Sequence, residues 1–189
     1  SQVGSVIGGE APFDYSGYSV SLSNDGSVVA IGAFGNDDQS SLKFDSGHVR
    51  VYRNINGTWT QIGGDIDGEA IGDQSGYSVS LSADGSVVAI GAVTNDGNGN
   101  DSGHVRVYRN INGTWTQIGT DINGKAIGEQ SGYSISLSDD GSAVAIGGYG
   151  NGTYRGIVRI YSIESDSTGP GAPTSLNTSA TITNNKTPT

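Results

Sequence analysis

The sequence predicts an all-β protein, a β-propeller-type array of three four-stranded antiparallel blades with essentially no helix. Residues 47–63 recur letter for letter at residues 103–119, and the stretch 16–23 returns with minor change at 75–82 and 131–138. A fixed period of about 56 residues is typical of folds in which one unit cannot bury its apolar face and stacked units share a core. No stretch carries a sustained 3.6-residue apolar period, so helices are not expected.

Each unit holds four short runs with the alternation or the β-branched enrichment of strands. In the middle unit these runs are 77–81, 87–92, 104–109 and 114–118. The blades of known propeller repeats take ~40 to 50 residues. A unit of the present length therefore fits one blade with one long loop.

Turn residues separate the runs. Residues 83–86 (Ala-Asp-Gly-Ser) join the first two runs of the middle unit, and residues 112–113 (Asn-Gly) join the last two. Both have the chemistry of hairpin turns, in which Gly, Asn or Asp accepts a positive φ. Asp139 and Asp140 fall in the equivalent turn of the third unit. That position favours a turn-stabilising role for these acids over the paired-carboxylate chemistry of a glycosidase.

The order of these segments resembles a known repeat. Each of the first two units reads Gly-Tyr-Ser-Val, a turn, Val-Ala-Ile-Gly-Ala, a loop and Gly-His-Val-Arg-Val-Tyr. This order resembles the FG-GAP repeat of integrin-type β-propellers, over residues 2–161, and implies a propeller fold. The FG-GAP repeat carries an Asp-rich calcium loop, whereas this chain has short turns at 24–27, 83–86 and 139–142. The resemblance therefore does not extend to that family's calcium site.

The composition changes near the C-terminus. We expect three blade repeats over 1–168, approximately 1–60, 61–116 and 117–168, and a Pro/Thr/Asn-rich segment over 169–189. That segment resembles the opening of the bacterial Ig-like repeats found in large surface adhesins. An Ig-like sandwich needs ~100 residues, so these residues are expected to form a linker or the start of such a domain.

The N-terminus carries a strand end that the third unit lacks. Residues 2–4 (Gln-Val-Gly) correspond to 61–63 and 117–119, the end of the Trp-containing strand, whereas the third unit has residues 164–168 in place of that strand. A propeller closes when such a first strand completes the last blade, which removes exposed edges. Three blades are fewer than the ~4 to 8 of known propellers. We therefore expect the chain to form part of a larger ring, within a longer polypeptide or by association of identical chains.

The composition limits the partners. With 19 acidic and 9 basic residues the formal net charge is −10, which opposes binding to nucleic acid and to anionic membrane surfaces. The chain has no cysteine and no methionine, which excludes disulfides, thiolate chemistry and soft-metal sites. It has no apolar stretch of membrane length, so membrane insertion is not expected. The acidic, Gly/Ser/Asn/Thr-rich character suits an extracellular or cell-surface repeat protein of a bacterium.

One loop has the spacing of a calcium ligand set. Residues 95–101 read Asn-Asp-Gly-Asn-Gly-Asn-Asp, which places side-chain oxygens two residues apart, as in the first ligands of an EF-hand-like loop. The twelfth position, which needs a bidentate acid, is Val107, and of the corresponding loops 36–45 is acidic whereas 150–153 has no carboxylate. The loop is interpreted as a Gly/Asn turn, with calcium binding as the alternative. No other cofactor is predicted.

The two histidines, His48 and His104, occupy equivalent strand positions, where the third unit has Ile157. A catalytic pair would need distinct partners, whereas these share one environment twice, so a structural role is predicted. The sequence shows no nucleophile elbow, phosphate-binding loop or His-rich metal motif. We therefore predict no catalytic residues and no enzymatic activity.

Aromatic side chains are the candidate ligand-binding residues. Trp59 and Trp115 lie on the fourth strand of their blades, and Tyr52 and Tyr108 close the third. Such rings either pack the rim of a blade or, at an outer edge, expose a surface for sugars. Sequons for glycosylation in a secreted protein occur at Asn56, Asn112, Asn151 and Asn177. Turn chemistry explains the first two sequons without a glycan.

Two functions follow from the sequence. The first is a non-catalytic structural or adhesive propeller segment of a large secreted or cell-surface protein, acting through self-association or through neighbouring domains of the same protein. The alternative is a carbohydrate-binding, lectin-like propeller with one weak site per blade, which gains affinity through multivalency. The identity of residues 47–63 and 103–119 favours repeated, cumulative binding, because copies this similar have not been individually specialised.

Overall fold

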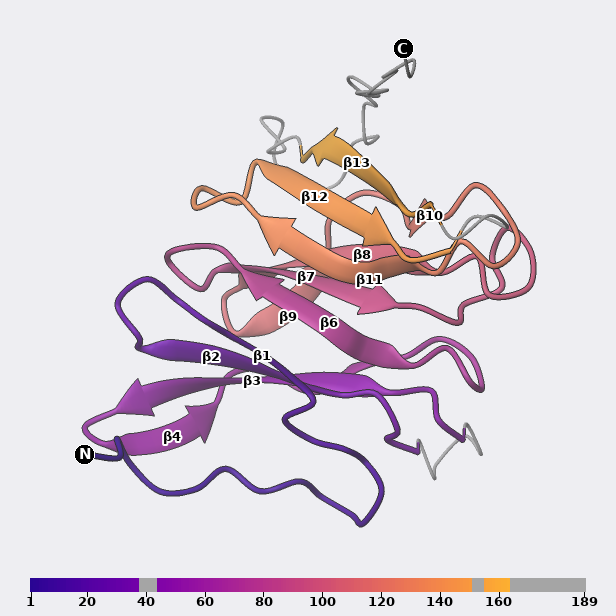
Figure 1. Ribbon diagram of the computed structural model, residues 1–189. Coiled ribbons are helices and arrows are strands. Elements are labelled where there is room, and N and C mark those ends of the chain that lie inside the picture. The colour runs from indigo at the N-terminus through magenta and orange to yellow at the C-terminus, as the bar shows by residue number, and fades with distance from the viewer. Residues whose placement is uncertain (38–43, 151–154, 164–189) are drawn as a thin grey trace.

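The structure, a computed structural model, describes residues 1–37, 44–150 and 155–163. Over these residues the regular elements are all β-strands, which form three antiparallel sheets stacked in chain order (Figure 1), and none of the three sheets closes on itself. The predicted all-β class is confirmed. Among the described residues, no helix is long and apolar enough to cross a membrane.

The first sheet has a broken edge strand. Its elements are β1 (Ser19–Leu22), β2 (Val28–Ala33), β3 (His48–Ile55), β4 (Thr58–Gln61) and β5 (Ile66–Asp67). Both β4 and β5 pair with the same edge of β3, with Tyr52 opposite Gln61 and Val49 opposite Ile66. The two segments are therefore halves of one edge strand, and the break between them places Asp65 beside the start of β3.

The second sheet repeats this pattern, and the third repeats its inner part. The second consists of β6 (Ser75–Leu81), β7 (Val87–Ala92), β8 (His104–Ile111), β9 (Thr114–Gln117) and β10 (Ile122–Asn123); the third consists of β11 (Ser131–Leu137), β12 (Ala143–Gly148) and β13 (Ile157–Ser162). The four strands predicted for the middle unit are confirmed, with ends that differ by at most two residues. The short strand β10 was not predicted. The tail over 169–189 lies outside the described residues.

The Asn-Gly turns and the Asp-Gly turns are stabilised in two different ways. In the Asn-Gly turns both residues take a positive φ, 52° for Asn56 and 86° for Gly57, as a type I′ turn requires. In the Asp-Gly turns the expected positive φ occurs at the glycine, for example 69° at Gly85. Asp84 instead accepts a hydrogen bond of 2.9 Å from the backbone N–H of Ser86 through its side chain.

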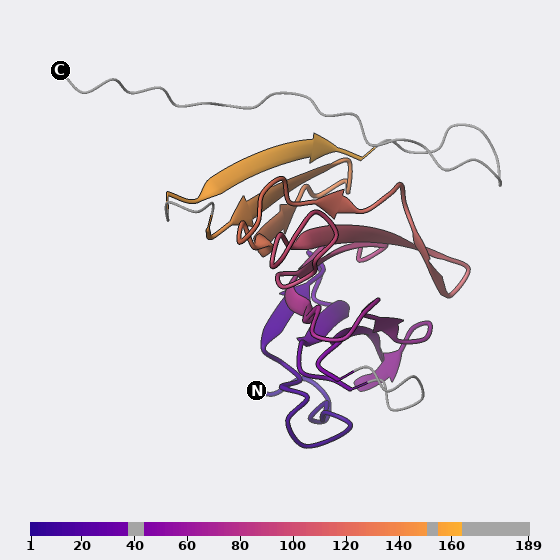
Figure 2. The same cartoon turned by 90° about the vertical axis from the view of Figure 1, so that its right-hand side faces the viewer.

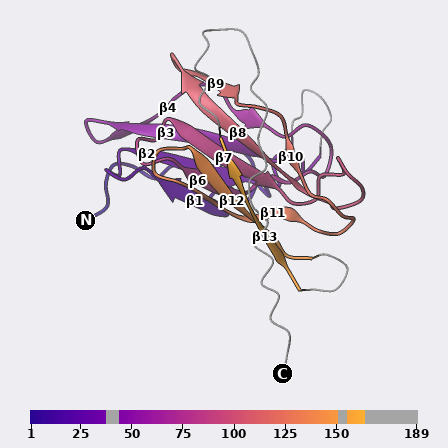
Figure 3. The same cartoon turned by 90° about the horizontal axis from the view of Figure 1, so that it is seen from above.

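Neighbouring sheets approach most closely along β1, β2, β6, β7 and β11. Ser19 Oγ donates to the carbonyl oxygen of Gly76 at 2.7 Å. A Cβ atom on Gly32 would overlap that same carbonyl oxygen. Glycine at this position therefore permits backbone to approach backbone. Seen along the stack in Figure 3, the outer strands β4 and β9 lie together at one margin.

Two apolar cores fill the spaces between the sheets. The core between the first two contains Val28, Ala30, Val49, Val51, Ile66, Val79, Leu81, Val88, Ile90 and Tyr108. The core between the second and third contains Val87, Ala89, Val105, Val107, Ile122, Leu137, Val144, Ile146, Tyr161 and Ile163. Because most members of one core are sequence equivalents of members of the other, the same interface is built twice, as expected for a stacked repeat array.

The N-terminal segment lies beneath the first sheet (Figure 2), and its residues 1–10 contain no strand. Ile7 and Trp59 pack against a small cluster on the outer face of that sheet. The indole Nε1 of Trp59 donates to the carbonyl oxygen of Val3 at 3.0 Å, and Trp115 donates to Ile62 at 2.8 Å. Val3 therefore occupies the same position relative to the first sheet that Ile62 occupies relative to the second. The alignment of residues 2–4 with 61–63 predicts this equivalence.

Candidate functional site

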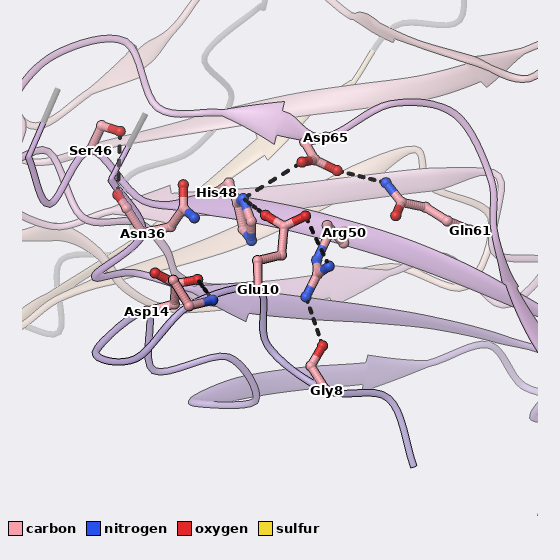
Figure 4. A network of polar contacts seen from close by, with 10 residues as sticks. Gly8, Glu10, Asp14, Asn36, Ser46, His48, Arg50, Gln61 and Asp65 are labelled. Atoms are coloured by element: carbon pink, nitrogen blue, oxygen red, sulfur yellow. Dashed lines mark hydrogen bonds and ion pairs between the residues drawn. The ribbon is translucent and has the colours of Figure 1, made fainter. Parts of the chain in front are cut away.

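The buried imidazole of His48 lies between two carboxylates from distant parts of the chain (Figure 4). Its Nδ1 is 3.9 Å from Glu10 Oε2 and 3.9 Å from Asp65 Oδ2. Glu10 comes from the N-terminal segment, His48 begins β3, and Asp65 comes from the break between β4 and β5. The separations are too long for direct hydrogen bonds, so the three groups surround a small space without bonding one another.

Each carboxylate is held by its other oxygen. Arg50 Nη1 lies 3.3 Å from Glu10 Oε1, and Gln61 Nε2 donates to Asp65 Oδ1 at 2.6 Å. Arg50 is itself fixed, because its Nη2 donates to the carbonyl oxygen of Gly8 at 3.0 Å. These contacts leave Glu10 Oε2 and Asp65 Oδ2 facing the imidazole.

The second sheet contains the same arrangement. The ligand atoms of Glu69, His104 and Asp121 lie within 4.8 Å of one another. Arg106 Nη1 lies 3.4 Å from Glu69 Oε1, and Gln117 Nε2 donates to Asp121 Oδ1 at 2.8 Å. Every contributing residue is the sequence equivalent of one in the first cluster.

The third sheet lacks this cluster of one histidine and two carboxylates. Lys125 stands where the other units have glutamate, and Ile157 stands where they have histidine. Arg159, the equivalent of Arg50 and Arg106, pairs with the buried carboxylate of Glu129, with Nη2 3.1 Å from Oε2. Histidine and glutamate have therefore been lost together, and the arginine has taken a new partner.

Burial keeps both imidazoles neutral near pH 7. Removal from water lowers the pKa of His48, and this effect outweighs the opposite effect of Asp65. Removal from water, together with the charge of Arg106, lowers the pKa of His104 to about 4. His48 is 2% exposed and His104 is 1% exposed, and the buried atoms Nε2 of His48 and Nδ1 of His104 have no hydrogen-bond partner.

Side-chain oxygens of the loop 95–101 accept hydrogen bonds from backbone N–H groups of the same loop. Asn95 Oδ1 accepts from the N–H of Gly97 at 2.9 Å, and Asp96 Oδ1 accepts from the N–H of Asp101 at 2.9 Å. Val107 is buried in β8. These contacts favour the turn interpretation, and calcium binding stays a prediction. Parts of the corresponding loops, 38–43 and 151–154, lie outside the described residues.

The aromatic rings selected from the sequence are engaged in packing. Tyr52 and Tyr108 are buried, and both tryptophans are half-buried with their Nε1 atoms bonded to backbone. Of the sequons, Asn56 and Asn112 lie in the tight turns with positive φ, and Asn151 and Asn177 lie outside the described residues. Asp140 accepts from Ser138, Ser142 and the turn backbone, which lowers the pKa of Asp140 to about 2.

A row of aromatic rings, exposed except for the half-buried Tyr77, crosses the sheets at one end. The ring centroids of Tyr18 and Tyr77 are 5.0 Å apart, those of Tyr77 and Tyr133 are 5.3 Å apart, and those of Tyr133 and Tyr149 are 5.1 Å apart. Hydrogen bonding with the Tyr18 side chain raises the pKa of Tyr77. The first three tyrosines belong to the repeated Gly-Tyr-Ser motif, and their alignment across sheets was not evident from sequence.

The outer face of the third sheet is apolar and exposed. Val158 is 66% exposed and Ile160 is 46% exposed, whereas their equivalents in the first two sheets are fully buried at the sheet interfaces. A shallow groove of about 690 Å³ runs along this face and includes Tyr133, Tyr149 and Val158 in its lining. The opposite end of the stack is also exposed, at Val20 and Leu22 of β1, whose equivalents in β6 are buried.

Comparison with known proteins supports the fold. A protein from Bacteroides uniformis, named as a candidate 6-phosphogluconolactonase, superposes with a TM-score of 0.52 at 15% identity over 80% of this chain and 38% of its own. Hydrazine synthase of Kuenenia stuttgartiensis gives a TM-score of 0.49 at 17% identity over 84% of this chain and 36% of its own. No family model and no curated protein matches the chain.

These likenesses bear on architecture alone, since the identities are low. The chain spans well under half the length of both structures, which are propeller-type chains. Together with the stacked antiparallel sheets, the likeness to the Bacteroides uniformis protein defines an all-β protein of propeller-like architecture.

Proposed function

We propose that this chain is a non-catalytic structural or adhesive segment of an extracellular β-propeller, which acts by docking its end sheets onto further sheets of the same kind. The exposed apolar face of the third sheet carries this proposal. Val158 and Ile160 occupy the positions that Val49 and Val51 occupy in the first sheet, where both valines are fully buried by the second. An apolar face of this kind on a propeller-like sheet is a docking surface for another blade.

The two internal interfaces define the contacts that such a sheet would make. At the second interface Ser78 Oγ donates to Gly132 O at 2.6 Å, and the N–H of Leu137 donates to Ser80 Oγ at 2.9 Å. The equivalent hydroxyls on the third sheet belong to Ser134 and Ser136. The exposed face therefore presents the same pattern of donors and acceptors as the buried ones.

The other end of the stack has the complementary form. The first sheet is preceded by residues 1–10, which pack against it through Ile7, and residues 2–4 of this segment are the sequence equivalents of 61–63 at the end of the edge strand β4. At the third sheet, over the described residues, β13 pairs with β12 alone. The N-terminal segment of a second copy thus supplies an edge strand for β13, while Val20 and Leu22 of that copy meet Val158 and Ile160. Such a head-to-tail contact is heterologous and leads to rings or filaments.

The extracellular assignment is supported by composition. The chain is acidic, lacks cysteine and is rich in Gly, Ser, Asn and Thr. It is also supported by the FG-GAP-like order of the strands, which resembles repeats of cell-surface proteins. The test is secretion of the full-length protein by its native host, followed by protease accessibility on intact cells.

Docking is tested by replacing the exposed pair with Val158→Asp and Ile160→Asp. The unaltered protein is expected to associate with increasing concentration in light scattering, and the double variant is expected to remain a monomer with an unchanged melting temperature, because both side chains are exposed. Val20→Asp at the opposite end should block the same association. A monodisperse monomer of unaltered protein at all concentrations would rule out docking between copies.

Glycan binding is a second candidate function, favoured by the aromatic row rather than by the rings selected from sequence. Tyr18 and Tyr133 are 53% and 42% exposed, and exposed aromatic faces present an apolar surface with a hydroxyl handle. Binding to a glycan array that Tyr133→Ala abolishes without loss of the fold would support it. Equal binding by the Tyr133→Ala variant would exclude this surface.

A further inference from the structure

We propose that the clusters Glu10–His48–Asp65 and Glu69–His104–Asp121 are two equivalent binding sites for a divalent first-row transition metal ion of the Zn²⁺ type. Each cluster offers one imidazole nitrogen and two carboxylate oxygens within 4.8 Å of one another. This inference is independent of the docking function.

The donor set selects the class of metal. One nitrogen and two oxygen donors suit Zn²⁺ and its neighbours, which commonly take three protein ligands and a water molecule. Calcium and magnesium prefer oxygen ligands throughout. The histidine therefore distinguishes these clusters from the loop 95–101, in which every side-chain donor is an oxygen or an amide.

The distances between the imidazole nitrogen and the carboxylate oxygens fit binding to a shared metal ion better than they fit direct hydrogen bonds. Zinc binds nitrogen and oxygen at about 2.0–2.1 Å, so tetrahedral ligand atoms lie about 3.4 Å apart. In the first cluster His48 Nδ1 lies 3.9 Å from both Glu10 Oε2 and Asp65 Oδ2. A shift of about half an ångström brings each carboxylate oxygen to that separation from Nδ1, whereas the present distances exceed those of a hydrogen bond.

The surrounding contacts are those of an outer ligand shell. In the first cluster Arg50 holds Glu10 Oε1 and Gln61 holds Asp65 Oδ1, while the remaining oxygens face the imidazole. Such partners orient metal ligands and fix which oxygen binds. Arg50 therefore contacts the oxygen of Glu10 that faces away from the imidazole, and it does not occupy the space between the ligands.

The buried imidazoles leave ring nitrogens without partners; in the first cluster the nitrogen that faces the carboxylates is Nδ1, and the unpaired nitrogen on the other side of the ring is Nε2. Both are almost fully buried, and each has a buried ring nitrogen without a hydrogen-bond partner. Buried polar atoms in native proteins are nearly always satisfied.

The third unit serves as an internal control. His48 and His104 correspond to Ile157, and Glu10 and Glu69 correspond to Lys125. A purely structural histidine does not require the glutamate to change with it, whereas two ligands of one ion lose their function together. The remaining arginine, Arg159, is paired with Glu129 instead.

The test is a titration of the chelator-treated full chain with Zn²⁺ in a calorimeter, and with Co²⁺ monitored by its visible absorption. Two ions per chain, an increase in melting temperature and the intense absorption of four-coordinate Co²⁺ are expected. His104→Ile, which copies the residue of the third unit, should leave one ion per chain. The double variant His48→Ile, His104→Ile should leave none.

Two further measurements keep the test decisive. Glu69→Gln retains the size of the side chain and should weaken the second site while leaving the first unchanged, even if an isoleucine at position 104 impairs folding. Asp96→Asn, in the loop 95–101, is the matched control and should still bind two ions. The proposal is overturned if unaltered protein binds no Zn²⁺, or if the folded double variant binds as many ions as the unaltered protein.

Discussion

Ser78 Oγ donates a hydrogen bond of 2.6 Å to the carbonyl oxygen of Gly132, across the boundary between the second and third sheets. Ser19 makes the same contact with Gly76 one sheet earlier, at 2.7 Å. In both places the receiving carbonyl also lies against a glycine of the donor sheet, Gly91 or Gly32. A small hydroxyl and a missing side chain together allow the sheets to meet at backbone distance.

Gly91→Ala should therefore destabilise the protein strongly. The new Cβ would overlap the carbonyl oxygen of Gly132, a backbone atom that cannot turn aside. Overpacking of this kind costs about 1–3 kcal/mol, measured as a shift in the urea midpoint. The matched control is Gly147→Ala on the exposed face, where the nearest atom is the rotatable Ser134 hydroxyl. An equal loss in both variants would contradict the close-approach argument.

Trp115→Phe should lower the free energy of unfolding by about 1 kcal/mol, because the 2.8 Å hydrogen bond to the Ile62 carbonyl is lost. Trp59→Phe removes the equivalent bond to Val3, which belongs to an exposed terminal segment. The second variant should therefore lose less. Urea unfolding followed by circular dichroism measures both, and a larger loss for Trp59→Phe would reverse the expected order.

Glu129→Gln should be destabilising by about 1–3 kcal/mol, because the buried carboxylate accepts from Arg159 and from the N–H of Lys125 at 3.0 Å. The comparison is Glu69→Gln with chelator present. Its carboxylate is 45% exposed and lies 3.4 Å from Arg106 Nη1, so less than about 1 kcal/mol is expected. Thermal melts of both variants supply the comparison, and equal losses would count against a special role for the third-sheet pair.

The stability of chelator-treated protein should fall as the pH drops from about 6.5 towards 4. The pKa of His104 is lowered to about 4 in the folded chain, below its ordinary value of 6.5. Between these values the unfolded chain binds a proton that the folded chain does not, so the free energy of unfolding rises with pH, by at most a few kcal/mol from this residue. His104→Ile removes that contribution. Identical slopes for the variant and the unaltered protein between pH 4 and 6.5 would refute it.

The repeat and the turn chemistry made the sheets predictable. The apolar, β-branched run 87–92 predicts a buried strand, and Asn56 with Gly57 predicts a type I′ turn from two residues. Strand β10 was missed because two residues show no periodicity; it exists because Ile122 pairs with Val105 of β8.

The candidate site was harder to predict because its members are far apart in sequence. Glu10 reaches His48 only because the N-terminal segment passes under the first sheet, and Asp65 does so only because the edge strand breaks beside it. Sequence showed that His48 and His104 are equivalent. The joint change of histidine and glutamate in the third unit was the available signal for a shared site.

The glycine contacts at Gly32 and Gly91 also determine the geometry of any longer assembly. At each glycine the backbone of one sheet contacts the backbone of the next in the same way. The same rotation and translation therefore relates each sheet to its neighbour. A repeated step closes into a ring if it is a pure rotation by a whole-number fraction of a full turn, and any translation along the axis produces a helical array instead. The backbone contacts at these two glycines therefore help to set how many sheets would complete one revolution.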